Sequence, residues 1–99
     1  MNDKEEILAF LRNNKETLRR RFHIVRIGLF GSFAKNRQRP DSDVDLIVEI
    51  ENGTPHLYTL KRELACFLEE RFGRRVDLAR EKYLKPYAKE AILKETIYV

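Results

Sequence analysis

Two aspartates one residue apart stand at the start of an alternating apolar segment. Asp43 precedes, and Asp45 lies within, the run from Val44 to Ile50. Side chains of a β-strand alternate between its two faces, so both carboxylates are expected to point the same way. Two such charges about 4 Å apart repel by roughly 4 kcal/mol at an effective dielectric of about 20. A bound divalent cation relieves this repulsion, and oxygen ligands favour Mg²⁺ or Mn²⁺.

A Gly-Ser pair closes the preceding apolar run, which extends from Ile24 to Phe30. If the two runs form antiparallel neighbouring strands, this pair lies beside the aspartates. Phosphate groups could then rest on its backbone amides, because glycine places no Cβ in their way. The connection between the strands is basic, as a polyphosphate site requires. We assign nucleotide binding to Gly31, Ser32, Lys35, Arg37 and Ser42.

A third carboxylate, Asp77, lies between Val76 and Leu78 in a short apolar run. Aspartate is a poor strand former, so its position there favours a role in a site. Directed at the other two aspartates, it could help to hold a second Mg²⁺ and deprotonate an incoming hydroxyl. Three carboxylates, two metal ions and a phosphate site suit in-line displacement at phosphorus. We assign Asp43, Asp45 and Asp77 as both catalytic and metal-binding residues.

The elements that must position these residues follow from capping signals and apolar spacing. A helix is expected from Asp3 to about Phe22, with an interruption at Asn13 and Asn14. Thr54 and Pro55 predict the start of a second long helix, and Gly73 its end. The remaining expectations are strands at 24–30, 44–50 and 75–79, a helical turn at 32–36, a helix from 86, and an edge strand at 97–99.

In the last helix, an inward-facing set is expected to comprise Leu84, Tyr87, Ala88, Ala91 and Ile92. The element order predicts a mixed α/β fold, in which helices flank a small mixed sheet. At 99 residues, the chain is expected to form one domain spanning residues 1–99.

The composition suits a globular protein, with 42% hydrophobic and 36% charged residues. No apolar stretch approaches the roughly 20 residues of a membrane span, and the polar start is unlike a signal peptide. A single cysteine, Cys66, excludes an internal disulfide. A cytoplasmic protein is expected. The net charge of +4 permits a polyanionic partner without requiring one.

The segments Gly31 to Ala34, Asp41 to Leu46 and Val76 to Leu78 together resemble the polymerase-β-type nucleotidyltransferases. The resemblance is strongest to the minimal nucleotidyltransferases, the antitoxin partners of HEPN-domain toxins, and it covers almost the whole chain. It implies a polymerase-β-like fold and transfer of AMP from ATP to a hydroxyl, or of the corresponding nucleoside monophosphate if another nucleoside triphosphate is the donor. A tyrosine of the HEPN toxin is the implied acceptor.

One departure from the family pattern lies beside the Gly-Ser pair. The family usually has Arg-Gly where this chain has Lys35-Asn36. Lysine keeps the positive charge but lacks the bidentate fork of arginine. Asparagine can adopt the left-handed backbone conformation that glycine would take. We expect only a modest perturbation of the site.

Two rival functions stay open at this point. The chain could neutralise a toxin by binding alone, although a pure binder gains nothing from three clustered acids. It could also bind nucleic acid, but its aromatic residues fall mostly on core stripes and not on a stacking platform. We do not expect nucleic acid to be the direct substrate. Association with a second copy of the chain and association with a partner protein both stay open.

Overall fold

A computed structural model describes residues 1–99, which form six helical segments and four strands. The helices are α1 (Lys4–Asn13), α2 (Lys15–Phe22), α3 (Gly31–Ala34), α4 (Leu57–Phe72), η1 (Glu81–Tyr83) and α5 (Pro86–Glu95). The strands are β1 (Ile24–Phe30), β2 (Val44–Ile50), β3 (Val76–Ala79) and β4 (Ile97–Tyr98). No helix has the length and apolar character that crossing a membrane requires.

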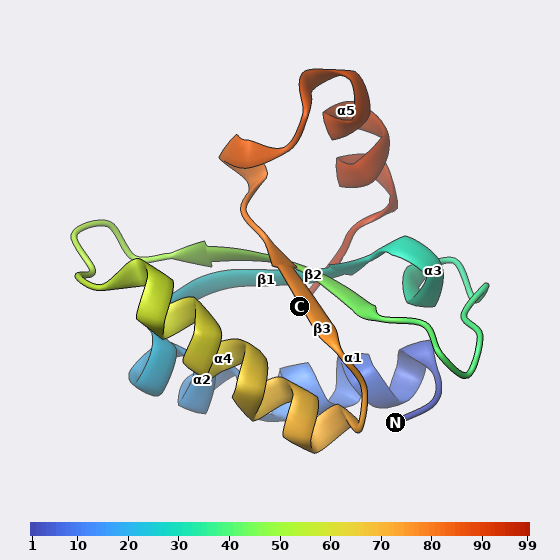
Figure 1. Cartoon of the computed structure of the whole chain (residues 1–99), viewed down its shortest axis with the longest axis horizontal. Coiled ribbons are helices and arrows are strands. Elements are labelled where there is room, and N and C mark those ends of the chain that lie inside the picture. The colour runs from blue at the N-terminus through green and yellow to red at the C-terminus, as the bar shows by residue number, and fades with distance from the viewer.

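The four strands form one mixed sheet in the order β3-β2-β1-β4. Strand β1 is antiparallel to both β2 and β4, and β3 runs parallel to β2. The predicted mixed α/β fold is therefore confirmed, as are the antiparallel pairing of the first two strands and the edge strand at the C-terminus. Helices α1, α2 and α4 lie on one side of the sheet, and α5 lies on the other (Figure 1).

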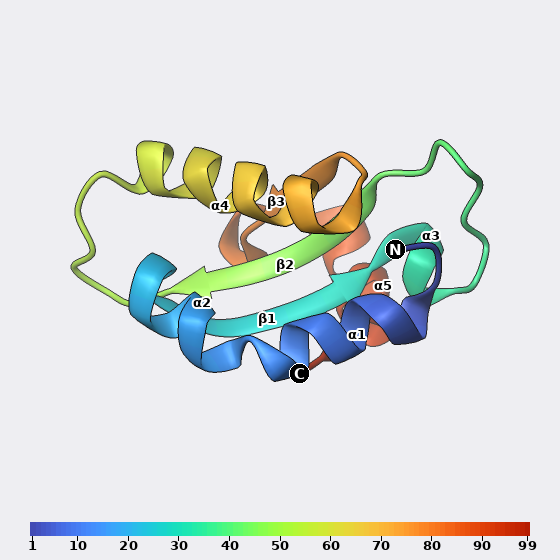
Figure 2. The ribbon, with the colours of Figure 1, turned by 90° about the horizontal axis from the view of Figure 1, so that it is seen from below.

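The apolar alternation of β2 determines which face of the sheet is buried. Its core-facing side chains are fully or almost fully buried: Val44, Leu46, Val48 and Ile50. They join one hydrophobic cluster with side chains from α1, α2 and α4. Figure 2 shows the ribbons of α1, α2 and α4 against this side of β1 and β2. The intervening residues of β2, including Asp45, must then lie on the opposite face.

The helix ends follow the local sequence signals. The Asp3 carboxylate accepts a hydrogen bond from the Glu6 N–H at 2.9 Å and caps α1. The predicted interruption of the helix is confirmed at Asn14, whose side-chain Nδ2 donates to the Phe10 carbonyl at 2.8 Å. Gly73, with φ +68°, ends α4 in the left-handed conformation that glycine tolerates best.

Two sequence-based expectations about helices were wrong. Helix α4 begins at Leu57, because the Thr54 hydroxyl donates to the Glu51 carbonyl and closes a turn instead of capping the helix. Tyr87 and Ala91 are exposed, and no residue of α5 is fully buried. The reason is that α5 stands away from the sheet, and its main contacts are with α3 and β1 (Figure 1).

Candidate functional site

Two of the three predicted carboxylates are side by side in the sheet. Asp45 of β2 and Asp77 of β3 are register partners in the parallel pair. Val76 and Leu78 pack against the core, so Asp77 projects from the same outer face as Asp45. Asp45 is half-buried, whereas Asp77 is exposed on a strand at the edge of the sheet. A molecule in solvent can therefore reach Asp77 directly.

The Asp45 carboxylate lies in an unfavourable electrostatic environment. Burial, followed in order of importance by the negative charges of Asp77, Asp43 and Glu95, raises the pKa of Asp45 from 3.8 to about 6. Asp45 therefore interacts with both of the other predicted aspartates. The fourth contributor, Glu95, comes from the end of α5. A cation at this position would offset the repulsion.

Gly31 lies directly against Asp45. Phe30, the last residue of β1, pairs with Asp45, and Gly31 follows with φ +75°. A Cβ on Gly31 would collide with the Asp45 carboxylate. Both the backbone angle and the space thus require glycine here. This close approach brings the backbone predicted to bind phosphate next to the carboxylate predicted to bind metal.

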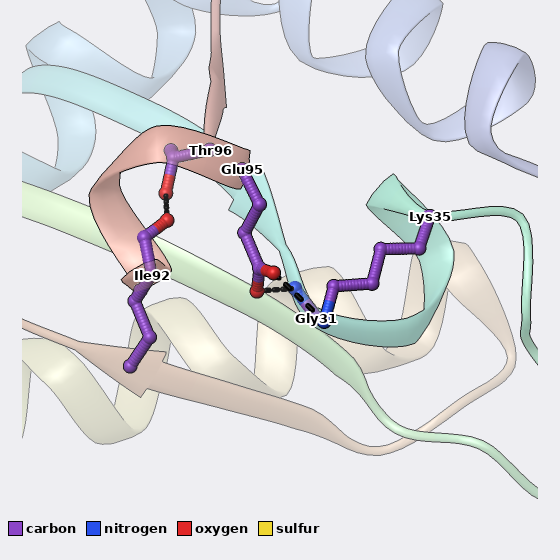
Figure 3. A network of polar contacts seen from close by, with 5 residues as sticks. All are labelled: Gly31, Lys35, Ile92, Glu95 and Thr96. Atoms are coloured by element: carbon purple, nitrogen blue, oxygen red, sulfur yellow. Dashed lines mark hydrogen bonds and ion pairs between the residues drawn. The ribbon is translucent and has the colours of Figure 1, made fainter. Parts of the chain in front are cut away.

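The Gly31 amide and the Lys35 ammonium both contact Glu95. Gly31 N donates to Glu95 Oε1 at 3.1 Å, and Lys35 Nζ lies 2.8 Å from Glu95 Oε2 (Figure 3). Asn36 adopts φ +56°, so it does take the left-handed conformation expected in place of glycine. Lys35 therefore keeps a positive charge at the site, and Asn36 keeps the left-handed backbone conformation that glycine would take.

Asp43 lies outside β2, at the end of the exposed loop that connects α3 to that strand. Arg74 holds this loop in place. Its guanidinium donates to the backbone carbonyls of Arg39, Pro40 and Ser42 at 3.3, 2.8 and 3.2 Å. Further bonds tie Arg74 to the N-terminal residues 1 and 2. Arg74 therefore anchors the backbone of the loop that leads to Asp43.

The other predicted nucleotide-binding residues lie in α3 and in the loop that follows it. Ser32 is half-buried in α3, and Arg37 is exposed. The Ser42 hydroxyl accepts a hydrogen bond from the Arg39 N–H at 2.8 Å, so it closes a turn of the loop. In this structure Ser42 thus shapes the segment before Asp43.

Sequence reasoning missed Glu95 and the role of Arg74. Glu95 reaches Gly31 across 64 positions of the chain, and no local pattern signals that contact. Arg74 stood out only as one member of a basic cluster. The one sequence signal was its position just after Gly73, which ends α4. A residue there lies in the short connection between α4 and β3.

The site is open and lacks a preformed metal cage. No three Asp, Glu, His or Cys side chains converge closely enough to enclose an ion within the chain. A surface hollow of about 480 Å³ lies elsewhere, between α2 and α4, and none of the three aspartates lines it. Any metal would therefore need oxygen ligands from outside the protein as well.

Comparisons with known proteins show which family this chain is similar to. A model of the nucleotidyltransferase domain matches residues 11–99. Protein adenylyltransferase MntA of Thermococcus cleftensis is 40% identical over 95 residues, which cover 96% of this chain and 94% of that protein. A candidate protein adenylyltransferase of Methanocaldococcus jannaschii is 35% identical over 100 residues, all of both chains.

Solved structures share the fold. A structure described as a candidate minimal nucleotidyltransferase is 37% identical, with a TM-score of 0.77, and the match covers 96% of this chain and 94% of the other. A toxin-antitoxin crystal structure with AMP-PNP is 22% identical, with a TM-score of 0.65 over 96% of this chain and 70% of the other. At that identity, the second match bears on the fold alone.

Proposed function

This chain belongs to the nucleotidyltransferase domain family, as a minimal nucleotidyltransferase, and we propose that it transfers AMP from ATP to a hydroxyl of a partner protein. The observation that carries this proposal is the contact of the Gly31 backbone with the Asp45 carboxylate. It brings an anion-binding amide and a cation-binding acid together, as a metal-bound triphosphate requires. The name of the Thermococcus relative supports adenylyl transfer to protein.

The donor set fits Mg²⁺, with Mn²⁺ as an alternative. Asp43, Asp45 and Asp77 are hard oxygen ligands, and burial together with the neighbouring negative charges raises the pKa of Asp45. Because Mg²⁺ commonly binds one or two carboxylates together with substrate phosphates, a preformed cage is not needed. Two ions would use these three residues. When bound, the metal neutralises charge on the triphosphate.

The chain's own residues then bind and orient the nucleotide. The Gly31 N–H donates to a phosphate oxygen, and the Lys35 ammonium offsets a further negative charge. Ser32 lies beside Gly31 in α3, and Arg37 extends the positive charge along the loop. Ser42 and Arg74 keep Asp43 at the start of β2. Oriented in this way, the α-phosphorus is held for attack.

Asp77 is the residue placed to act on the acceptor. Its exposed carboxylate accepts the proton from the incoming hydroxyl, whose oxygen forms a bond to the α-phosphorus. The bond from that phosphorus to the bridging oxygen breaks, and pyrophosphate leaves. The transferred AMP remains on the acceptor oxygen. Asp45 is more buried, so it has less access to an acceptor than Asp77 has.

The openness of the site favours an acceptor on the surface of a folded protein. Asp77 lies on an edge strand, and helical apolar stripes are used in the chain's own core. We propose a tyrosine of a HEPN-family toxin as the acceptor and an antitoxin role for this chain. The added nucleotide would bring bulk and negative charge to a surface that must bind RNA phosphates.

The transfer can be followed with ATP labelled at the α- or γ-phosphate. The chain is incubated with Mg²⁺, either label, and the product of the neighbouring gene. Retention of the α-label alone on that product would support AMP transfer. Retention of the γ-label would contradict it, since the γ-phosphate should leave in pyrophosphate.

A neutralisation assay separates modification from simple binding. If Asp43→Asn combined with Asp45→Asn still protects cells from the partner as well as the unmodified chain does, neutralisation occurs by binding. Loss of protection, with the partner still co-purifying with the double variant, supports neutralisation by modification.

A further inference from the structure

Glu95 occupies the two donors that the proposed function assigns to phosphate. We call this pair, the Gly31 N–H and the Lys35 Nζ, the anion site. Each oxygen of the Glu95 carboxylate contacts one of the two, at 3.1 Å and 2.8 Å (Figure 3). The Glu95 side chain is 21% exposed and the Lys35 side chain 47%. The chain thus fills its own anion site with a partly buried internal anion.

The last turn of α5 delivers Glu95 to this position. The Thr96 N–H and hydroxyl both bond to the Ile92 carbonyl, at 3.1 Å and 2.7 Å, and end the helix there. Tyr98 then pairs with Gly28 of β1. A Cβ on Gly28 would collide with Thr96 and Tyr98, so the segment after Glu95 lies tightly against β1. These contacts therefore hold the backbone on the C-terminal side of Glu95 in place.

The Glu95 contact is also easy to reverse. The Glu95 carboxylate pairs with Lys35, but it is also repelled by the negative charge of Asp45. No residue of α5 is fully buried, and the helix stands away from the sheet (Figure 1). Elements with few buried contacts open at low free-energy cost. A stronger anion could therefore displace Glu95 without unfolding the core.

We propose that Glu95 is an internal competitor for the anion site, displaced when the phosphates of a nucleotide bind. This inference rests on the proposed function, because it takes the Gly31 and Lys35 groups as phosphate ligands. In the free chain, Glu95 occupies the anion site in a fraction of the molecules, and these molecules cannot bind phosphate there. The apparent affinity for phosphates is reduced accordingly. Binding releases the last turn of α5 from α3, which couples this helix to occupancy of the site.

The test uses inorganic tripolyphosphate with Mg²⁺, which contains the phosphate chain without base or sugar. Its affinity is measured by calorimetry for the unmodified chain, for Glu95→Gln and for Glu95→Ala. Glu90→Gln is the matched control, because Glu90 is an exposed acid of the same helix that pairs with Lys94. Both Glu95 variants should bind at least about threefold more tightly, and Glu90→Gln should not.

Hydrogen exchange of residues 92–96, the last turn of α5 and its C-cap, gives a readout independent of affinity. Tripolyphosphate should speed exchange there in the unmodified chain, whereas in Glu95→Ala the exchange should already be fast without the ligand. Equal or weaker binding by both Glu95 variants, while the unmodified chain binds, would overturn the competitor role and leave the proposed function standing. Absence of binding by every variant would overturn the anion site itself, and the proposed function with it.

Discussion

Asp45 and Asp77 are register partners across the parallel strands β2 and β3, and both project from the sheet face opposite the core. One is half-buried and the other is exposed. Their charges oppose each other, and Asp43 and Glu95 add to the repulsion. The site thus holds excess negative charge at the position where the backbone of Gly31 approaches most closely. Such a cost to stability is typical of functional sites.

Asp45→Asn should stabilise the metal-free protein in a pH-dependent way. Burial and nearby acids raise the pKa of Asp45 from its ordinary 3.8 to about 6, so the folded state retains a proton that the unfolded state has lost. Stability contributed by the protonated group is therefore lost as pH rises from about 4 to about 6. At pH 7 the free energy of unfolding of Asp45→Asn should exceed that of the unmodified chain by on the order of 1 kcal/mol, after allowance for solvent screening.

Urea unfolding in EDTA at several pH values checks this gain. Asp41→Asn is the control, since Asp41 is an exposed acid of the preceding loop. A difference between Asp45→Asn and the unmodified chain that stays constant from pH 4 to pH 7 would contradict the electrostatic account.

Gly31→Ala should be more damaging than a comparable change at Gly53. Both glycines have positive φ, +75° and +84°, but only at Gly31 would a Cβ meet another atom, the Asp45 carboxylate. The backbone cost should be about 1 kcal/mol at each position, and the collision should add about 1–2 kcal/mol at Gly31. Chemical denaturation measures both. Equal destabilisation by the two changes would mean that the close approach to Asp45 is not real.

Arg74→Ala should loosen the loop that leads to Asp43. Arg74 donates five hydrogen bonds to the loop and the N-terminal residues, and these should stabilise the fold by about 1–3 kcal/mol in total. Hydrogen exchange of residues 37–44 should accelerate, and nucleotide transfer should slow. Arg75→Ala is the control, because Arg75 is exposed. Unchanged exchange in that loop would exclude the positioning role of Arg74.

Asp77→Asn should separate chemistry from binding. Because Asp77 is exposed and is proposed to act on the acceptor, its loss should slow single-turnover transfer by about 10²–10⁴-fold while ATP affinity changes little. Asp45→Asn, next to the Gly31 backbone, should both slow transfer and weaken ATP binding. Comparison of ATP titrations with single-turnover rates tests the division. Weakened ATP binding with an unchanged rate for Asp77→Asn would contradict it.

The sequence predicted the parts of the site that lie on regular strands. The alternation of Val44 to Ile50 determined which residues of β2 face the core, and the short run around Asp77 indicated a strand beside it. Glycine at position 31 was expected to leave room for phosphate groups, and in the structure it is the Asp45 carboxylate that a Cβ there would meet. Periodicity is informative here because one face of the sheet is fully buried.

Long-range contacts at the chain's end were not predictable in this way. The apolar spacing of α5 predicted an inward-facing Tyr87, yet this side chain is 88% exposed. Periodicity gives the faces of a helix but not whether a partner covers them. The contact of Glu95 with Gly31 depends on where the whole helix stands, and that position is determined by the pairing of β4 with β1.

The central claim, that Asp43 and Asp45 carry AMP transfer to a partner protein, is tested most directly by intact-mass spectrometry of that partner. The partner is incubated with ATP, Mg²⁺ and either the unmodified chain, the Asp43→Asn, Asp45→Asn double variant, or Asp41→Asn as the control. The account predicts adenylate-sized mass additions with the unmodified chain and with Asp41→Asn, and none with the double variant. Additions of equal extent with the double variant, or none with the unmodified chain, would contradict it.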